Sequence, residues 1–289
     1  MTSTGVLETW VVDAWKEKTR QKEYGFLFSR AETAANLASM VGGLIGGLVA
    51  VFSLQLPFLL GGVVFLSTWA MSLFLLEEKT SIKKIKINQI ITKSLEIIKQ
   101  GTKESIKNSQ VLSVALYAGL TMIGIKALDM FWSKRFVDMA SGKVWVTGYI
   151  WVLVSLFMIL GNLALKSWTD KQKGYIKGIM VYTIMAGLAI FLSALSQNFY
   201  LAIFFFLIYE ISRGIHRPAL FGYFNKIIPS QKRATILSFT ITLTWAGSAL
   251  GLLILGWVAK KYSIEASWLT ASLIILLSLI PVFKLKTSY

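Results

Sequence analysis

The chain has 289 residues, of which 55% are apolar and 15% are charged, whereas a soluble domain carries about 25% charged residues. Its net charge of +16 would indicate a nucleic-acid partner in a soluble protein, but here the basic residues lie mainly in short loops between apolar runs. The composition therefore excludes an ordinary soluble domain. It predicts contact with a lipid bilayer and none with nucleic acid.

The residue types that hold metals and cofactors are almost missing. The chain has no cysteine, which excludes disulfides and thiolate metal sites, and one histidine, which excludes a site of several histidines within one chain. There is no phosphate-binding Gly-Lys-Ser/Thr loop, and a serine–histidine–acid triad would have to use His216 in a basic stretch. We expect no metal, no cofactor and no enzymatic activity.

Eight apolar runs predict an all-α, polytopic membrane protein with about eight transmembrane helices. A short apolar segment, residues 1–12, precedes them and lacks the features of a signal peptide. The predicted spans cover about residues 31–53, 57–76, 109–131, 144–165, 178–195, 199–219, 235–258 and 265–283.

A charged connector, residues 77–108, separates the second span from the third. It holds eight lysines and four glutamates, and its segment IKINQIITKSLEIIKQ is amphipathic at helical period. This pattern predicts a helix that lies on the cytoplasmic membrane surface.

The loops alternate between basic and sparsely charged, which predicts their sides of the membrane. The amino-terminal segment, the connector, the linker 166–177, the loop 225–234 and the tail are basic, while Ser53–Pro57 and Ser196–Tyr200 carry no charge. Lys134, Arg135 and Lys143 break the alternation. Positive-inside reasoning places both termini in the cytoplasm of a multi-pass plasma-membrane protein.

One stretch, residues 203–240, carries a family resemblance. It contains E-x-x-R-G-x-x-R-P followed by N-x-x-I-P-S-x-x-R-A-T-x-L-S. This pattern resembles the tenth and eleventh helices of the major facilitator superfamily (MFS) of secondary transporters. The resemblance implies that the first complete span corresponds to the family's fifth helix and the last to its twelfth.

The same resemblance implies a domain organisation. Residues 1–76 would be a remnant of the amino-terminal helical half, 77–108 the cytoplasmic connector, and 109–289 a complete carboxy-terminal six-helix half. The first three helices of the family fold and most of the fourth have no counterpart. This pattern indicates a truncated gene, a misplaced start codon or a split transporter.

Transport of a small solute by alternating access is the function that the resemblance implies, coupled to an ion gradient, with protons as the expected ion. Alternating access needs two halves, so the chain by itself is expected not to transport. The alternative is a membrane subunit or remnant without transport of its own. It would need a partner chain or a second copy to cover the missing helices.

Glu210 is the first candidate site residue. A carboxylate at the bilayer centre costs roughly 2.5–3.5 kcal/mol on insertion scales. Arg213 and Arg217 follow at helical spacing and share its face. Glu210 and Arg213 are either a coupling or substrate-contacting pair, or a structural ion pair that stabilises helix packing.

Two further pairs could line a cavity. Lys126 and Asp129 lie three residues apart near the expected outer end of the third span, where they bind substrate or pair with each other. Glu32 and Asn36 lie one turn apart at the inner end of the first complete span, where they face the cavity or cap the helix. His216 is expected to face a loop or the membrane interface.

Two Gly-x-x-x-Gly pairs form a weak internal repeat and predict close helix packing. Gly43–Gly47 and Gly247–Gly251 are 204 residues apart, and each follows an Arg-Ala dipeptide. In the family, the fifth helix packs on the eighth and the eleventh on the second. Because the second helix has no counterpart, the Gly247–Gly251 face is expected to be open to lipid or to another chain.

Overall fold

The computed structural model describes residues 25–75, 102–103, 106–166, 172–227 and 233–285. All regular elements in these residues are helices, which confirms the all-α fold, and seven of them are long and apolar enough to cross a membrane. The expected surface helix of the connector falls mostly on residues 76–101, outside the described part of the chain.

The helices follow the predicted spans closely at most of their ends. In the described part of the chain they are α2 (Gly25–Val49), α3 (Leu56–Leu75), α5 (Ser109–Met139), α6 (Val146–Lys166), α7 (Gln172–Leu195), α8 (Phe199–Ile227), α9 (Arg233–Lys261), α10 (Ile264–Leu277) and α11 (Leu279–Val282). The apolar part of α2 with described side chains, Leu37–Val49, is shorter than a full span.

Helix α5 is longer than predicted, because it continues eight residues beyond the expected end near residue 131, to Met139, and α8 likewise continues eight residues beyond its expected end, to Ile227. The charged residues that suggested an end are paired instead: Lys134 Nζ lies 2.9 Å from Asp138 Oδ2, one helical turn away. As a consequence, Lys126 and Asp129 lie near the middle of this 31-residue helix. The prediction that they lie near its outer end is wrong.

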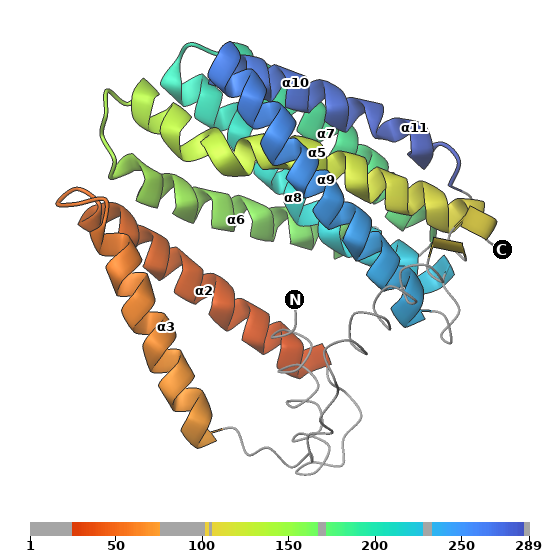
Figure 1. The fold of residues 1–289 in the computed structure, drawn as a ribbon, viewed down its shortest axis with the longest axis horizontal. Coiled ribbons are helices and arrows are strands. Elements are labelled where there is room, and N and C mark those ends of the chain that lie inside the picture. The colour runs from red at the N-terminus through yellow and green to blue at the C-terminus, as the bar shows by residue number, and fades with distance from the viewer. Residues whose placement is uncertain (1–24, 76–101, 104–105, 167–171, 228–232, 286–289) are drawn as a thin grey trace.

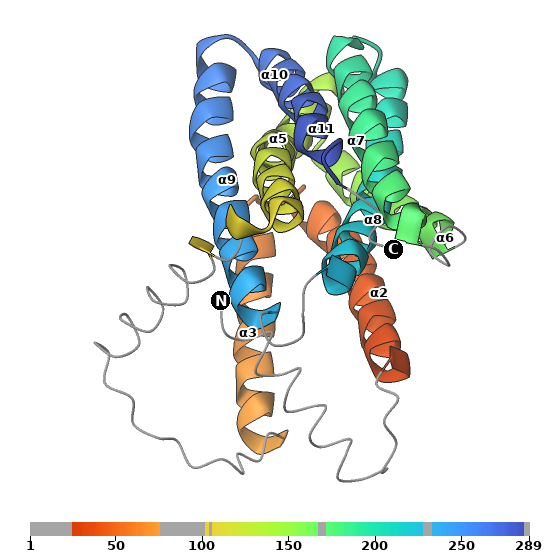
Figure 2. The same cartoon turned by 90° about the vertical axis from the view of Figure 1, so that its right-hand side faces the viewer.

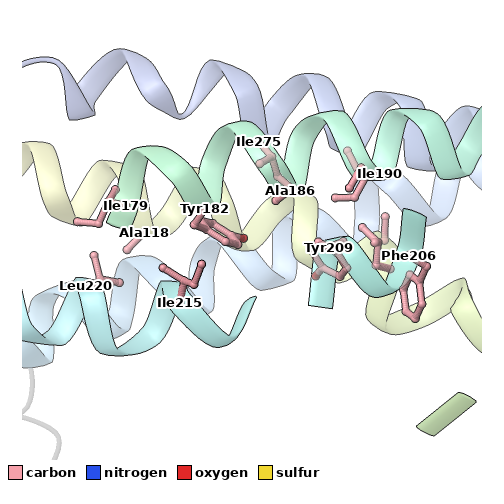
Figure 3. Packing of buried hydrophobic residues seen from close by; sticks show 14 of the residues in the cluster. Ala118, Ile179, Tyr182, Ala186, Ile190, Phe206, Tyr209, Ile215, Leu220 and Ile275 are labelled. Atoms are coloured by element: carbon pink, nitrogen blue, oxygen red, sulfur yellow. The ribbon is translucent and has the colours of Figure 1, made fainter. Parts of the chain in front are cut away.

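Helices α5 to α11 pack side by side as one bundle, and α2 and α3 form a hairpin beside it (Figures 1 and 2). Helix α2 packs on α6, whereas none of the apolar window of α3 is buried. The bundle core lies between α5, α7, α8 and α10; Figure 3 shows Tyr182 and Ile190 of α7 near Tyr209 and Phe206 of α8.

Glycines bring the backbones of neighbouring helices into contact. A methyl group added to Gly47 of α2 would lie 2.7 Å from the backbone of Gly148 on α6. On α6, Gly161 has the same relation to α8, where a methyl group would overlap Ile211 and lie 3.1 Å from Gly214 Cα. These helices therefore approach too closely for any side chain at the crossing points.

The second glycine pair corrects an expectation. Gly247 and Gly251 are buried and pack on α5, where they lie against the backbone of Gly119 and Ile123. The expectation that this glycine face is open to lipid or another chain is wrong. The resemblance to the family gave the second helix as the partner of this face. It did not show that α5 packs there.

Arg135 joins three helices at the end of the bundle opposite to the residue 109 end of α5. Its side chain is only 2% exposed, and it forms an ion pair with Glu265 at the start of α10. Its Nη2 donates to the carbonyl oxygens of the last turn of α7 and the residue after it, at 3.0–3.2 Å: Ser193, Ala194 and Ser196. These carbonyls have no partner within the helix. Arg135, which seemed to be a loop charge in the sequence, is therefore a buried structural residue.

Gly247→Ala should destabilise the protein by about 1–3 kcal/mol, because the new methyl group would overlap the Gly119 carbonyl oxygen. Gly256→Ala on the same helix is the matched control, since a methyl group there would meet nothing closer than Met130 Cε at 3.9 Å. Thermal unfolding of the purified variants in detergent measures the difference. Equal melting temperatures would contradict the close contact of α5 and α9.

Candidate functional site

Four charged side chains from α5 and α8 form one network in the middle of the bundle. Arg213 Nη1 donates to Glu210 Oε1 at 3.2 Å on its own helix and lies 3.5 Å from Asp129 Oδ1 across the helix interface. Lys126 Nζ donates to Asp129 Oδ2 at 2.9 Å. Helical spacing explains each pair. The link between the two pairs comes from the packing of α5 near α8, which the sequence did not reveal.

The four side chains of the network differ in their exposure to solvent. Glu210 is 1% exposed, whereas the side chains of Lys126, Asp129 and Arg213 are 27–33% exposed. Two cations balance two carboxylates when all four are ionised. Among the described residues Glu210 Oε2 has no hydrogen-bond partner, so half of a buried carboxylate is unsatisfied. Such a group needs a proton or a water molecule.

Buried aromatic residues lie next to this network. The Arg213 guanidinium lies 5.7 Å from the centre of the Tyr209 ring, a cation–π contact. Tyr209 of α8 and Tyr182 of α7 are both fully buried. Their hydroxyl groups, like Glu210 Oε2, have no partner within the described residues. The buried side of the network therefore has several polar atoms that could bind water.

His216 is buried in the same core, and the expectation that it faces a loop or the interface is wrong. Its ring stacks on Tyr182 with centroids 4.1 Å apart and meets Tyr117 edge-on at 5.7 Å. These partners come from α7 and α5, far from His216 in the sequence, which is why local sequence did not predict the burial. The side chain of Arg217 lies outside those that the structure describes.

A hollow of about 330 Å³ adjoins the network between α5 and α9. This volume is within the range of small-molecule sites. On α9 the lining residues recur at helical spacing beside the glycines that pack on α5. The lining residues are Lys126, Asp129, Met130, Trp245, Ser248, Ala249 and Leu252. The hollow thus combines one ion pair with a mainly apolar wall.

The remaining candidates lie elsewhere. Glu32 and Asn36 are on α2, which packs on α6, and their side chains lie outside those described. In the part of the chain that the structure describes, no group of three or more Asp, Glu, His or Cys side chains could hold a metal ion. The site consists of ion pairs, aromatic rings and a hollow.

The family model described as Major Facilitator Superfamily matches residues 6–252, a range that includes the whole charged network and the hollow. Among curated proteins no sequence is significantly similar.

Arg213→Ala should be strongly destabilising, by about 3–5 kcal/mol, because it leaves Glu210 buried without its cation. Lys126→Ala breaks a more accessible pair and should cost about 1 kcal/mol or less. Adding Glu210→Gln to Arg213→Ala should restore part of the lost stability, since the stranded carboxylate is gone. Chemical unfolding in detergent measures all three. A double variant no more stable than Arg213→Ala would show that the buried charge is not the cause.

Proposed function

Because the chain belongs to the major facilitator superfamily, a family of membrane transporters, we propose that it takes part in moving a small solute by alternating access and couples this movement to protons through Glu210. We further propose a plasma-membrane location with both termini in the cytoplasm. The alternation of basic and sparsely charged loops supports this orientation.

The unsatisfied carboxylate of Glu210 is the observation that carries the proton proposal. One of its oxygens accepts a hydrogen bond from Arg213 and the other has no partner among the described residues. A proton on the free oxygen removes the buried charge and weakens the hold of Glu210 on Arg213. Arg213 is then free to interact more strongly with Asp129, 3.5 Å away. Proton binding at a buried group can therefore change contacts at a more accessible one.

Glu210→Gln tests proton coupling. Cells that produce the protein from its native locus are screened with labelled small molecules for accumulation that a protonophore abolishes. Because glutamine keeps the size of the side chain but cannot cycle a proton, the variant should lose at least about tenfold of this accumulation. Asp138→Asn is the matched control, since Asp138 pairs only with the exposed Lys134 in the described structure. Wild-type, protonophore-sensitive accumulation by Glu210→Gln would contradict the proposal.

A second candidate function is a membrane subunit that does not transport by itself. The exposure of α3 favours it, because none of the apolar window of this helix is buried. In this case the protein purified in mild detergent should have the mass of a homo-oligomer or carry a second chain, and it should show no gradient-driven uptake after reconstitution. A monomer without a co-purifying chain would rule this candidate out.

A further inference from the structure

We propose that the hollow between α5 and α9 binds a small organic anion with an apolar or aromatic body, and that this anion enters together with the proton on Glu210. The inference rests on the proposed function and specifies its substrate class. It starts from the donors and acceptors that the charged network leaves available.

Asp129 is already engaged by cations on both of its oxygens. Lys126 occupies Oδ2 and Arg213 lies next to Oδ1. A cationic substrate at this carboxylate would have to displace one of them and would meet the positive charge of both. The hollow is therefore unsuited to a cation.

Hydrogen-bond donors outnumber acceptors at the edge of the hollow. Lys126 has three N–H donors, one of which is used by Asp129, and Arg213 has five, of which Nη1 serves both carboxylates. An anionic group that reached Lys126 would find free donors there. Carboxylate and phosphate groups form strong, charge-assisted hydrogen bonds with ammonium and guanidinium groups.

Proton binding changes the balance of charge. With all four side chains ionised, the network is neutral, and with a proton on Glu210 it carries one net positive charge. The other titratable side chains nearby are His216 on the same helix, Tyr117 of α5 and Tyr182 of α7, which pack against one another and are counted here in their neutral forms. One proton therefore creates an attraction for one anion, and the pair crosses the membrane without net charge.

The apolar residues that line the hollow determine which kind of uncharged ligand body fits there. Trp245, Met130 and Leu252 line the hollow and are exposed, and Ser248 adds a hydroxyl group to the lining. The Ser248 hydroxyl donates to the Thr244 carbonyl oxygen at 3.0 Å, so it offers acceptor rather than donor capacity to a ligand. These lining residues favour a ligand with an aromatic or aliphatic body over a sugar or a peptide.

Three isosteric probes test the charge preference: 1-naphthoate, neutral 1-naphthamide and cationic 1-naphthylmethylammonium. Binding to the purified full chain in detergent is measured by titration calorimetry at pH values from 5 to 8. Naphthoate should bind at least about tenfold more tightly than either isostere, and more tightly at acidic than at basic pH. Equal binding of the three, preference for the cation, or no binding of naphthoate at any pH would overturn the proposal.

Variants separate the anion contact from general folding. Lys126→Gln should lose at least about tenfold in naphthoate affinity, Lys126→Arg should retain it, and the exposed Lys134→Gln is the control that should not change it. Glu210→Gln should bind naphthoate with little dependence on pH, because its side chain is always neutral. Unchanged naphthoate affinity in Lys126→Gln would overturn the anion contact.

The two proposals fail in different ways. Tight binding of naphthoate without pH dependence in the wild type would overturn its link to the proton on Glu210 and leave the anion contact standing. Proton-coupled accumulation of a cation in cells would overturn the anion site and leave the proposed function standing.

Discussion

Contact between glycine backbones is the constraint on which the arrangement of these helices depends. Lipid is as apolar as the helices, so a bilayer provides little hydrophobic drive for their association, and close packing must supply it. Gly161 and Gly214 bring α6 against α8, and Gly119 and Gly247 bring α5 against α9. Gly214 is adjacent to Arg213 in the sequence, so the same crossing that holds α8 in place also positions the backbone from which the Arg213 side chain extends.

The charged network is tolerated in the bundle because its members neutralise one another at short range. Charges interact strongly in a medium of low dielectric constant, and an unpaired carboxylate there would be costly. Arg213 is shared between two carboxylates, of which Glu210 is buried and Asp129 is partly accessible. A guanidinium group between two such partners responds to any change in the charge of either one. This makes the network suitable for coupling as well as for stability.

Hydropathy and charge predicted the helices well because both are local properties of the chain. They failed where a distant helix decides the outcome: Arg135 is buried by the end of α7 and by Glu265, and His216 by rings from α5 and α7. The ion pairs within one helix followed from their spacing. The contact between Arg213 and Asp129 could not, because no pattern in one sequence shows which faces of α5 and α8 meet.

The separation between Glu210 and the hollow has a mechanistic consequence. The hollow is lined by Lys126 and Asp129, and Glu210 is not among its lining residues. A ligand there would not contact Glu210, the proposed proton-binding group, directly, so the two could influence each other only through Asp129 and Arg213. Competition of two carboxylates for one guanidinium group provides such a connection without a large movement. The proton and the solute can therefore occupy different places and still be linked by charge.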